Sequence, residues 1–324
     1  MPLSFPASPT TGQQSTQNGR TFSWTGYAWE LVAASGGGGL SWSSVPASAT
    51  ATGTAGNIAY DNANGFFYVA TNTDTWKRAA LSTWVNWAPT ALSGLSVWFD
   101  SSDASTLYDS TSGGSLAGAN ATVKRWQDKS GNSRHATSNT GPTRKTAAIN
   151  SLDALLFDGS TSNLSFSGNV YGTSGYTTVF AVVRKASVSG TAMIMSQDNG
   201  ALSPRTYQYL RVVDASLQSI WFTSGPTAQS VSAASSVSAN TTFLATLRIG
   251  AGGGAVSLNG TAGTANSNVS GVLTNTEPTY IGAFAYASNE FGGHICEVVA
   301  YDSALSDANK AVVESYLMTK WGVA

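Results

Sequence analysis

Short runs in which apolar and polar residues alternate recur along this chain, and polar turns separate them. Alternation with a period of two is typical of a β-strand with one buried face. In residues 242–249, four apolar side chains alternate with polar ones, and only Leu244 interrupts the pattern. Asn259-Gly260 follows a further run, and this pair is the strongest short hairpin signal. The clearest strands are predicted at 96–99, 154–157, 177–184, 207–213, 217–222, 242–249 and 294–301.

One helix is predicted, near the end of the chain. Ser306 is a suitable N-cap, and Asp307 favours the positive end of a helix dipole. Lys320 falls in the last turn, and Gly322 is a stop signal. The expected buried stripe comprises Val312, Val313, Tyr316 and Leu317. We expect this helix to pack across a sandwich.

The N-terminal part has the pattern of two small β modules. In residues 1–35, Phe22 and Trp24 alternate on one strand and Trp29 lies on the return strand, which predicts a hairpin pinned by Trp24 and Trp29. Four glycines, 36–39, indicate a joint. Residues 40–88 predict a second meander, with its strands at 56–61, 66–70 and from Thr75 onward.

Residues 90–324 then form a third domain, and the fold class is all-β: an antiparallel jelly-roll sandwich with a short C-terminal helix, preceded by the two modules. A module of about fifty residues has only a marginal core. We therefore expect residues 1–88 to form a homotrimer or another homo-oligomer, or to bind a docking surface.

Composition narrows the function. Only 10% of residues are charged and the net charge is −1, so no long-range field attracts nucleic acid or an anionic membrane. The first residues contain neither a basic region nor an apolar run, and no segment reaches the ~18 apolar residues of a membrane span. We expect a chain without an export signal whose neutral polar surface suits an extracellular setting, as in a virion.

The single cysteine, Cys296, rules out a disulfide within the chain. Strand alternation predicts that Cys296, Val298 and Ala300 share a face and that Glu297 lies on the other. We expect a buried, inert thiol.

Four segments of the long domain form an ordered set. They are Leu95 to Leu107, beginning Leu-Ser-Val-Trp-Phe-Asp; Val123 to Ala136, with Trp-Gln-Asp-Lys-Ser-Gly-Asn; Leu155 to Ser160; and Cys296 to Gly322, with Ala-Tyr-Asp and Lys-Trp-Gly. Together they resemble the concanavalin A-like, laminin G-like jelly roll of phage and bacterial surface proteins, over residues 92–322. The N-terminal modules resemble short modules of phage fibre and virion proteins. The resemblance implies a binding or structural sandwich that often recognises glycans and sometimes uses calcium.

Catalysis is not expected. The glucanases of this fold carry their acids in one Glu-x-Asp-x-x-Glu-like run, which is absent here, and no glutamate has an acidic residue within two positions. Carboxylates from distant strands could still meet in space. His135 and His294 are expected to be structural, because neither belongs to a zinc-type cluster and a triad would need a Ser and an Asp beside one of them.

Calcium is the one candidate cofactor. Asp128 and Asp158 are the predicted metal ligands, from a wider set of Asp100, Asp103, Asp128, Asp158 and Asp198. The favoured alternative is an Asx-turn, in which the carboxylate binds its own backbone. The predicted glycan-binding residues are Asp198, Asn199, Tyr207, Tyr209 and Trp221, each of which a core or loop role would explain equally well.

The functional hypothesis is a phage virion surface protein: head decoration (cement or fibre) or tail fibre. It would attach to capsid or tail through residues 1–88 and bind host surface polysaccharide through the sandwich, without contacting nucleic acid or membrane. The alternatives are a secreted bacterial adhesin or lectin, and a glycoside hydrolase.

Overall fold

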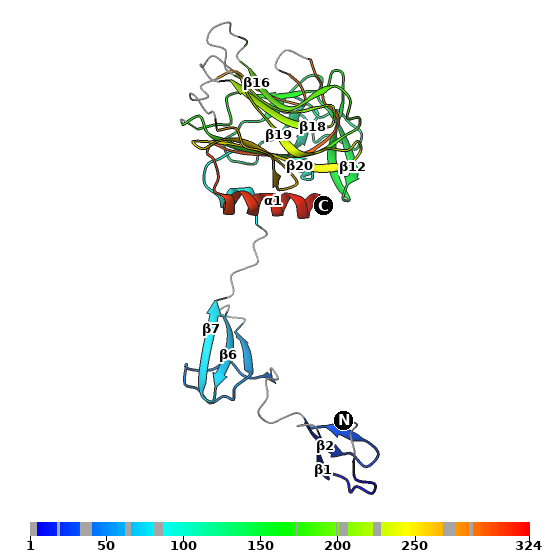
Figure 1. Cartoon of the computed structure of the whole chain (residues 1–324), viewed down its shortest axis with the longest axis vertical. Coiled ribbons are helices and arrows are strands. Elements are labelled where there is room, and N and C mark those ends of the chain that lie inside the picture. The colour runs from blue at the N-terminus through cyan, green and yellow to red at the C-terminus, as the bar shows by residue number, and fades with distance from the viewer. Residues whose placement is uncertain are drawn as a thin grey trace. The chain divides into compact units, whose positions relative to one another are not determined.

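The computed structural model describes residues 5–17, 20–32, 41–61, 66–80, 87–172, 174–198, 200, 207–222, 228–267, 276–284 and 288–324. The chain divides into two compact units, Met1–Asn86 and Trp87–Ala324 (Figure 1). It is mostly β-structure, as the alternation predicts, with one α-helix among the described residues.

The first unit contains the two predicted small modules. The first is a three-stranded antiparallel sheet of β1 (Gln14–Gln17), β2 (Arg20–Trp24) and β3 (Trp29–Leu31). Trp24 and Trp29 are cross-strand partners with ring centroids 5.7 Å apart, so the predicted pinning is confirmed. The Phe5 ring stacks on Trp29 at 4.9 Å and closes this small aromatic cluster.

The second module is a four-stranded sheet. Its strands are β4 (Ser41–Trp42), β5 (Asn57–Asp61), β6 (Phe66–Asn72) and β7 (Thr75–Ala80). Three of them match the predicted meander, whereas β4 was not predicted and pairs in parallel with β5. Its cluster of buried apolar side chains among the described residues is small: Ala59, Tyr68, Ala70 and Trp76.

The second unit is a sandwich of two antiparallel sheets. The larger sheet runs in the order β19 (Gln229–Ser236), β18 (Ser216–Phe222), β17 (Tyr207–Val213), β16 (Thr191–Asp198), β23 (Thr279–Ile281), β14 (Leu164–Phe166), β11 (Ala136–Thr137), β10 (Arg125–Trp126) and β9 (Leu107–Tyr108). The other runs β12 (Thr143–Ile149), β13 (Leu152–Asp158), β24 (Gly292–Tyr301), β15 (Thr177–Lys185), β20 (Thr242–Gly250), β21 (Gly253–Leu258) and β22 (Thr261–Ala262), with β8 (Leu95–Asp100) also paired to β24. Short 3-10 helices cover Pro89–Ala91 and Ala104–Thr106.

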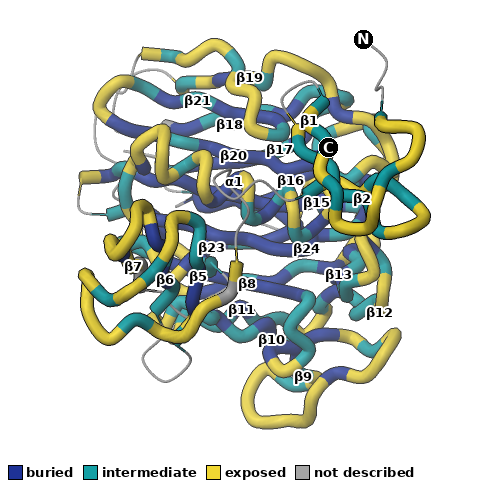
Figure 2. Tube along the Cα trace, turned by 90° about the horizontal axis from the view of Figure 1, so that it is seen from below, coloured by how far each residue is buried: buried dark blue, intermediate teal, exposed yellow. Residues whose placement is uncertain are grey.

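The main hydrophobic core lies between these two sheets, where Figure 2 shows the strands largely buried. It is built from the inward residues of the alternating strands, including Phe99, Trp126, Leu210, Trp221 and Leu247. All the strands predicted for this domain are present, with ends shifted by no more than two residues. The Asn259-Gly260 pair forms the tight turn between β21 and β22, and both residues have positive φ.

Helix α1 (Asp307–Trp321) packs on the outer face of the eight-stranded sheet, against β20 and β15 (Figure 1). Its ends are as predicted: the Ser306 side chain accepts a hydrogen bond from Asn309 N, and Gly322 is left-handed at the C-cap. The buried stripe is partly different, because Val312 is 43% exposed and Glu314 is buried in its place. No helix in the described part of the chain has the length and apolar character that crossing a membrane requires.

A β-bulge in β24 changes the predicted faces around Cys296. The register between β15 and β24 shifts at this point, so the strict alternation breaks. Cys296 is buried and free, as predicted, but packs with Val299 and Tyr301 on the helix side, whereas Val298 and Ala300 face the main core. Burial raises the pKa of the thiol well above its ordinary value, which keeps Cys296 protonated and unreactive.

Candidate functional site

A continuous row of side chains crosses the outward face of the nine-stranded sheet. Each strand contributes one residue, and each residue is the direct register partner of the next. The row consists of Tyr108, Arg125, Thr137, Ser165, Tyr280, Ser196, Tyr209, Ile220 and Ser230. Their sequence neighbours, such as Trp126 and Leu210, point into the core. The alternation of the strands therefore places every row residue on the opposite face.

The chemistry of this outward row is neutral and aromatic, apart from one cation. Tyr108, Arg125 and Tyr280 are half-buried, so part of each ring or guanidinium group faces outward. The Arg125 guanidinium lies over the Tyr108 ring, 4.0 Å from its centroid. Adjacent strands lie about 4.8 Å apart, so an extended ligand that crosses the strands from Tyr108 to Tyr280 meets a new side chain at each step. Beyond Tyr280 the row residues Ser196 and Tyr209 are buried. Hydroxyls between aromatic rings can bind a neutral ligand with many hydroxyl groups.

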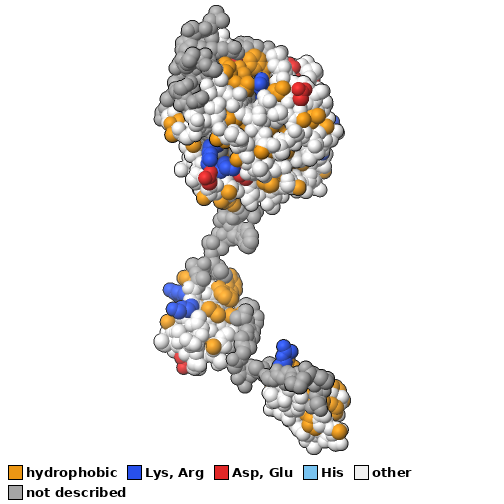
Figure 3. Space-filling view, in the orientation of Figure 1, with side chains coloured by type: hydrophobic (Ala, Val, Ile, Leu, Met, Phe, Trp, Pro, Cys, Tyr) orange, Lys and Arg blue, Asp and Glu red, His pale blue; other side chains and the backbone are white. Residues whose placement is uncertain are grey.

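Charged side chains are also sparse on the face of the sandwich that Figure 3 shows. In Figure 3 the visible face of the sandwich is mostly neutral, and the Lys, Arg, Asp and Glu side chains form a few small groups. This agrees with a charged content of only 10%. Recognition here would depend on hydrogen bonds and ring contacts rather than on long-range attraction.

Three of the predicted glycan-binding residues lie together on the adjacent strands β16 and β17 of the same sheet. Tyr207 stacks on Tyr209, with ring centroids 4.7 Å apart and planes inclined by 10°. The Tyr209 hydroxyl donates a hydrogen bond to Asp198, whose carboxylate also accepts the NH of Gly200 at 2.8 Å. Tyr209 and Asp198 are only 7% and 2% exposed, so Tyr207 is the most accessible of the three. The fourth, Asn199, lies outside the described residues.

Trp221, the central residue of that prediction, belongs to the core. Its side chain is 0% exposed and packs between the two sheets. A Cβ atom placed on Gly254 of the opposite sheet would lie 2.3 Å from Trp221 Cη2, which shows how closely the ring meets that backbone. No face of the indole is open to a sugar, so its core role replaces the predicted role as a binding platform.

Asp128, one of the two predicted calcium ligands, binds NH and OH groups. Its Oδ1 accepts Trp98 N and Ser130 N, both at 2.9 Å, and its Oδ2 accepts Ser130 Oγ at 2.7 Å and Arg134 N at 3.1 Å. The bond from Asp128 to the NH group of Ser130, two positions on, forms the Asx-turn that was the favoured alternative to a calcium site. The carboxylate fixes the loop against β8.

Asp158 has a similar arrangement. Its Oδ1 accepts the NH groups of Ser160, Thr161 and Ser162, each at 2.9 Å, and its Oδ2 accepts Thr161 Oγ1 at 2.8 Å. Although burial alone would raise it, the pKa of Asp158 is held well below its ordinary value by these NH groups. Among the described residues, no three His, Cys, Asp or Glu side chains are grouped as a metal site.

We expect removal of calcium to leave the thermal stability unchanged. Donor groups already surround the oxygens of Asp128 and Asp158, so calcium would have to displace hydrogen bonds that hold their loops. The measurement is a thermal melt of the whole protein in excess EDTA and in millimolar CaCl₂, with MgCl₂ as the control. A midpoint several degrees higher in CaCl₂ alone would contradict this expectation.

The two histidines contact other groups than those of a catalytic triad. His135 Nδ1 accepts the main-chain NH of Asp128 at 3.1 Å. His294 lies 3.3 Å from Arg184, and burial together with this cation lowers its pKa to about 4. His294 is therefore neutral at physiological pH.

The fold does bring two carboxylates together from distant parts of the sequence, and sequence reasoning did not identify this pair. Asp100 on β8 and Glu297 on β24 are direct register partners. Lys320 from α1 joins them, at 2.8 Å from Asp100 Oδ1 and 2.7 Å from Glu297 Oε2. Glu297 also accepts the indole NH groups of Trp98 and Trp321, both at 2.7 Å. With Glu297 0% exposed, this cluster anchors the helix to the sheet.

Comparison with protein families agrees with this architecture. Residues 158–309 match the family model described as the concanavalin A-like lectin/glucanases superfamily. The matched residues lie within the sandwich, whose topology is a concanavalin A-like, laminin G-like jelly roll. No curated protein matches the chain in sequence.

Solved structures share the fold at low sequence identity. The binding domain of Paraclostridial Mosquitocidal Protein 1 has a TM-score of 0.51 and 12% identity, over 71% of this chain and 53% of that one. Domain 4 of AbnA, a GH43 extracellular arabinanase from Geobacillus stearothermophilus, in complex with arabinotriose, has a TM-score of 0.50 and 16% identity, over 68% of this chain and 97% of that one. The botulinum neurotoxin serotype D binding domain has a TM-score of 0.48 and 12% identity, over 69% of this chain and 51% of that one. This chain thus spans about half the length of the toxin domains that it matches.

Proposed function

We propose that this chain is a surface protein of a phage particle, and that its sandwich binds a neutral host glycan along the outward row of the nine-stranded sheet. The row is the observation that carries the proposal. It places Tyr108, Arg125 and Tyr280 on an outward face, with Thr137 and Ser165 hydroxyls between them. Aromatic rings stack on sugars while hydroxyls exchange hydrogen bonds with them. Arabinotriose, the ligand of the arabinanase domain with a similar fold, is a neutral oligosaccharide of this kind.

The N-terminal modules support attachment to other proteins. Six large apolar side chains are strongly exposed among the described residues, and four of these lie in the first unit: Tyr27, Leu31, Val45 and Tyr60. The modules have small cores, and domains of this size gain stability from a partner. We infer that these surfaces contact capsid or tail proteins or further copies of the chain. Repeated copies would raise weak glycan affinity through avidity.

The virion assignment also rests on the four ordered segments from Leu95 to Gly322, which resemble sandwiches of phage and bacterial surface proteins. We expect immunogold labelling of phage particles with antibody against the sandwich to decorate the particle. Label spread over the head would indicate a decoration protein, and label on the tail a receptor-binding fibre. Particles without label would overturn the virion assignment and favour a free adhesin.

The glycan site predicts a specific mutational effect. We expect Tyr280→Ala to weaken binding of the whole protein to host surface polysaccharide about tenfold, because one lost ring contact of about 1.4 kcal/mol corresponds to that factor. Biolayer interferometry with immobilised polysaccharide would measure this. Tyr27→Ala is the matched control, since Tyr27 is 81% exposed but lies in the first module.

Equal binding by the Tyr280→Ala variant, with its fold intact by circular dichroism, would remove the row as the site. Release of reducing sugar during the same incubation would show hydrolysis. That result would replace the proposed glycan-binding function with a glycoside hydrolase function.

A further inference from the structure

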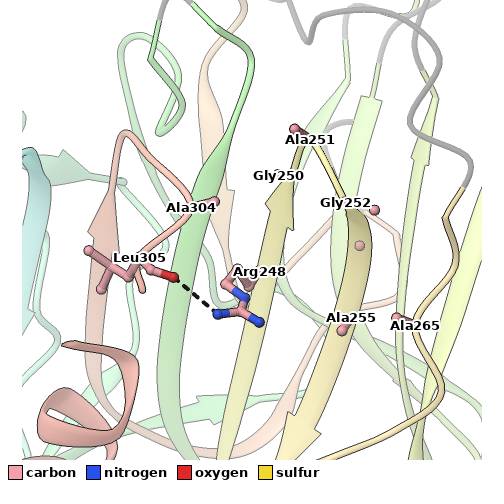
Figure 4. Close-up of a pocket in the computed structure, with 10 residues that line it drawn as sticks. Arg248, Gly250, Ala251, Gly252, Ala255, Ala265, Ala304 and Leu305 are labelled. Carbon is pink, nitrogen blue, oxygen red and sulfur yellow. Dashed lines mark hydrogen bonds between the residues drawn. The ribbon is translucent and has the colours of Figure 1, made fainter. Parts of the chain in front are cut away.

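A recess lies on the eight-stranded sheet, at the tip of the β20–β21 hairpin (Figure 4). It encloses about 230 Å³. The hairpin tip forms one side of this pocket, and Ala304 and Leu305, just before α1, form another. Most of the lining is glycine or alanine, so backbone and methyl groups make up its walls. This volume suits one sugar-sized ring rather than a long chain.

Arg248 is the one charged residue that lines the pocket. In Figure 4 its guanidinium group lies between the Leu305 segment and the hairpin. Its Nη1 donates to Leu305 O at 3.1 Å and to Asp307 Oδ1 at 2.5 Å. Its Nε and Nη2 atoms have no hydrogen-bond partner within the described part of the chain. The edge of the planar guanidinium group that carries Nε and Nη2 is therefore available to bind a carboxylate through two parallel hydrogen bonds.

Asp307 does not prevent an anion from binding to Arg248. Its side chain is 87% exposed, and exposed ion pairs contribute little to stability because solvent screens them. A ligand carboxylate would be more shielded in the pocket than Asp307 is at the surface. The N-terminal end of α1 starts beside the pocket and adds a positive potential.

We propose that this pocket binds a ligand bearing a carboxylate, of the size of one acidic sugar residue, with Arg248 holding the carboxylate. The site goes beyond the proposed function and is independent of the outward row, because it lies on the other sheet and uses other residues. A chain with both sites would bind a neutral stretch of polysaccharide at the row and an acidic residue here.

Gly252 lines the pocket, and the fold leaves room for a side chain at this position. A Cβ atom there would meet nothing within 4 Å, and its backbone φ is not in the left-handed region. Gly253 does not allow this, because its φ is +119° and a Cβ would lie 2.2 Å from Asn266 O. Gly118 matches Gly252 in both respects but lies away from the pocket, so Gly118→Leu is the control for Gly252→Leu.

The test is a titration of the whole protein with methyl glucuronide, methyl glucoside and acetate, followed by backbone and arginine side-chain NMR signals at low salt. We expect methyl glucuronide to bind at least tenfold more tightly than either of the others, and to shift the signals of Arg248 Nε and Gly252. Arg248→Gln and Arg248→Lys should each weaken binding about tenfold, because neither keeps this planar pair of donors. Gly252→Leu should abolish binding and Gly118→Leu should leave it unchanged.

Asp307→Asn provides a test that loss of folding cannot mimic. It removes the negative charge that competes for Arg248, so affinity for methyl glucuronide should rise severalfold while affinity for methyl glucoside stays constant. Equal affinities for glucuronide and glucoside would overturn the proposal. So would tight acetate binding, which indicates a site for any small anion, and so would wild-type affinity in Arg248→Gln or Gly252→Leu. None of these outcomes bears on Tyr280 and the outward row.

Discussion

Replacing Lys320 with Met is expected to lower the free energy of unfolding of the sandwich by about 3–5 kcal/mol at neutral pH, the usual cost of breaking a buried ion pair. Lys320 is the cation between Asp100 and Glu297, at 2.8 and 2.7 Å. The side chains of these acids are only 5% and 0% exposed. Without the ammonium group, Glu297 faces the Asp100 carboxylate across neighbouring strands, and Lys129, 3.0 Å from Asp100 Oδ2, is the cation that remains paired with Asp100. The helix also loses a direct bond to the sheet.

The size of this effect should depend on pH. Burial and the nearby Asp100 carboxylate raise the pKa of Glu297 above its ordinary value. Burial acts in the same direction on Asp100, but Lys320 and Ser102 outweigh it and hold the pKa of Asp100 below its ordinary value. Asp100 therefore stabilises the fold above its ordinary pKa and loses this contribution as pH falls through its lowered value. The contribution of Glu297 has the opposite sign, being most favourable below its ordinary pKa and lost as pH rises through its raised value.

Removing Lys320 raises the pKa of both acids, because the cation favours their ionised forms. The deficit of Lys320→Met should thus be greatest at neutral pH and should shrink as the pH approaches about 4, where the carboxyl groups take up protons. Urea unfolding at several pH values, followed by near-ultraviolet circular dichroism, would measure it.

Lys310→Met is the matched control, since it removes a lysine from the same helix. Lys310 pairs with Glu314, one turn away at 2.8 Å, and the Glu314 side chain is itself only 7% exposed. Removing Lys310 leaves one buried carboxylate unpaired, whereas Lys320 serves two, so we expect a smaller loss of stability than for Lys320→Met. Equal losses in the two variants, or a Lys320→Met deficit that does not vary with pH, would contradict the role assigned to this cluster.

Strand alternation, turn residues and helix-capping residues predicted the fold well, because each depends on interactions between residues close in sequence. The strand at residues 207–213 has the predicted bounds, and the Asn259-Gly260 turn and the Ser306 cap are where their chemistry places them. The periodic pattern predicted the wrong buried face where contacts with other parts of the chain determine which side chains are buried. The bulge at Cys296 breaks a strict alternation that the sequence itself suggests. Glu314 replaces Val312 in the buried stripe because Lys310 neutralises its charge.

The candidate site was less accessible to prediction, for a physical reason. Tyr108 and Tyr280 are far apart in sequence, and each belongs to a strand of two or three residues that carries almost no periodic signal. Only the order of the strands in the sheet places them in one row. Asp100 and Glu297 illustrate the same limit, because their pairing is set by the register of β8 against β24. Composition could show that aromatic residues are plentiful, but not which of them face outward.

Trp221 allows the difference between a buried and an outward-facing aromatic residue to be tested. Replacing it with Ala should lower the free energy of unfolding by about 3–5 kcal/mol, as is usual for truncating a buried tryptophan. The ring is 0% exposed and meets the backbone of Gly254 across the core. Gly254→Ala should be destabilising by itself, because the added Cβ would lie 2.3–2.8 Å from three ring atoms of Trp221. In the Trp221→Ala background, the same methyl group enters the space that the ring has left. We therefore expect the two changes to couple, so that the double variant is more stable than the sum of the single losses allows.

The functional consequence separates a core tryptophan from a binding platform. Below its unfolding transition, Trp221→Ala should bind host polysaccharide as tightly as the wild type, whereas Tyr280→Ala should not. Urea unfolding of the wild type, the two single variants and the double variant gives the coupling free energy. Interferometry at low temperature gives the affinities for polysaccharide. Additive stability losses would show that Trp221 does not pack on Gly254. A folded Trp221→Ala variant that no longer binds would mean that the ring reaches the ligand, and the binding site would then extend from the sheet face into the space between the sheets.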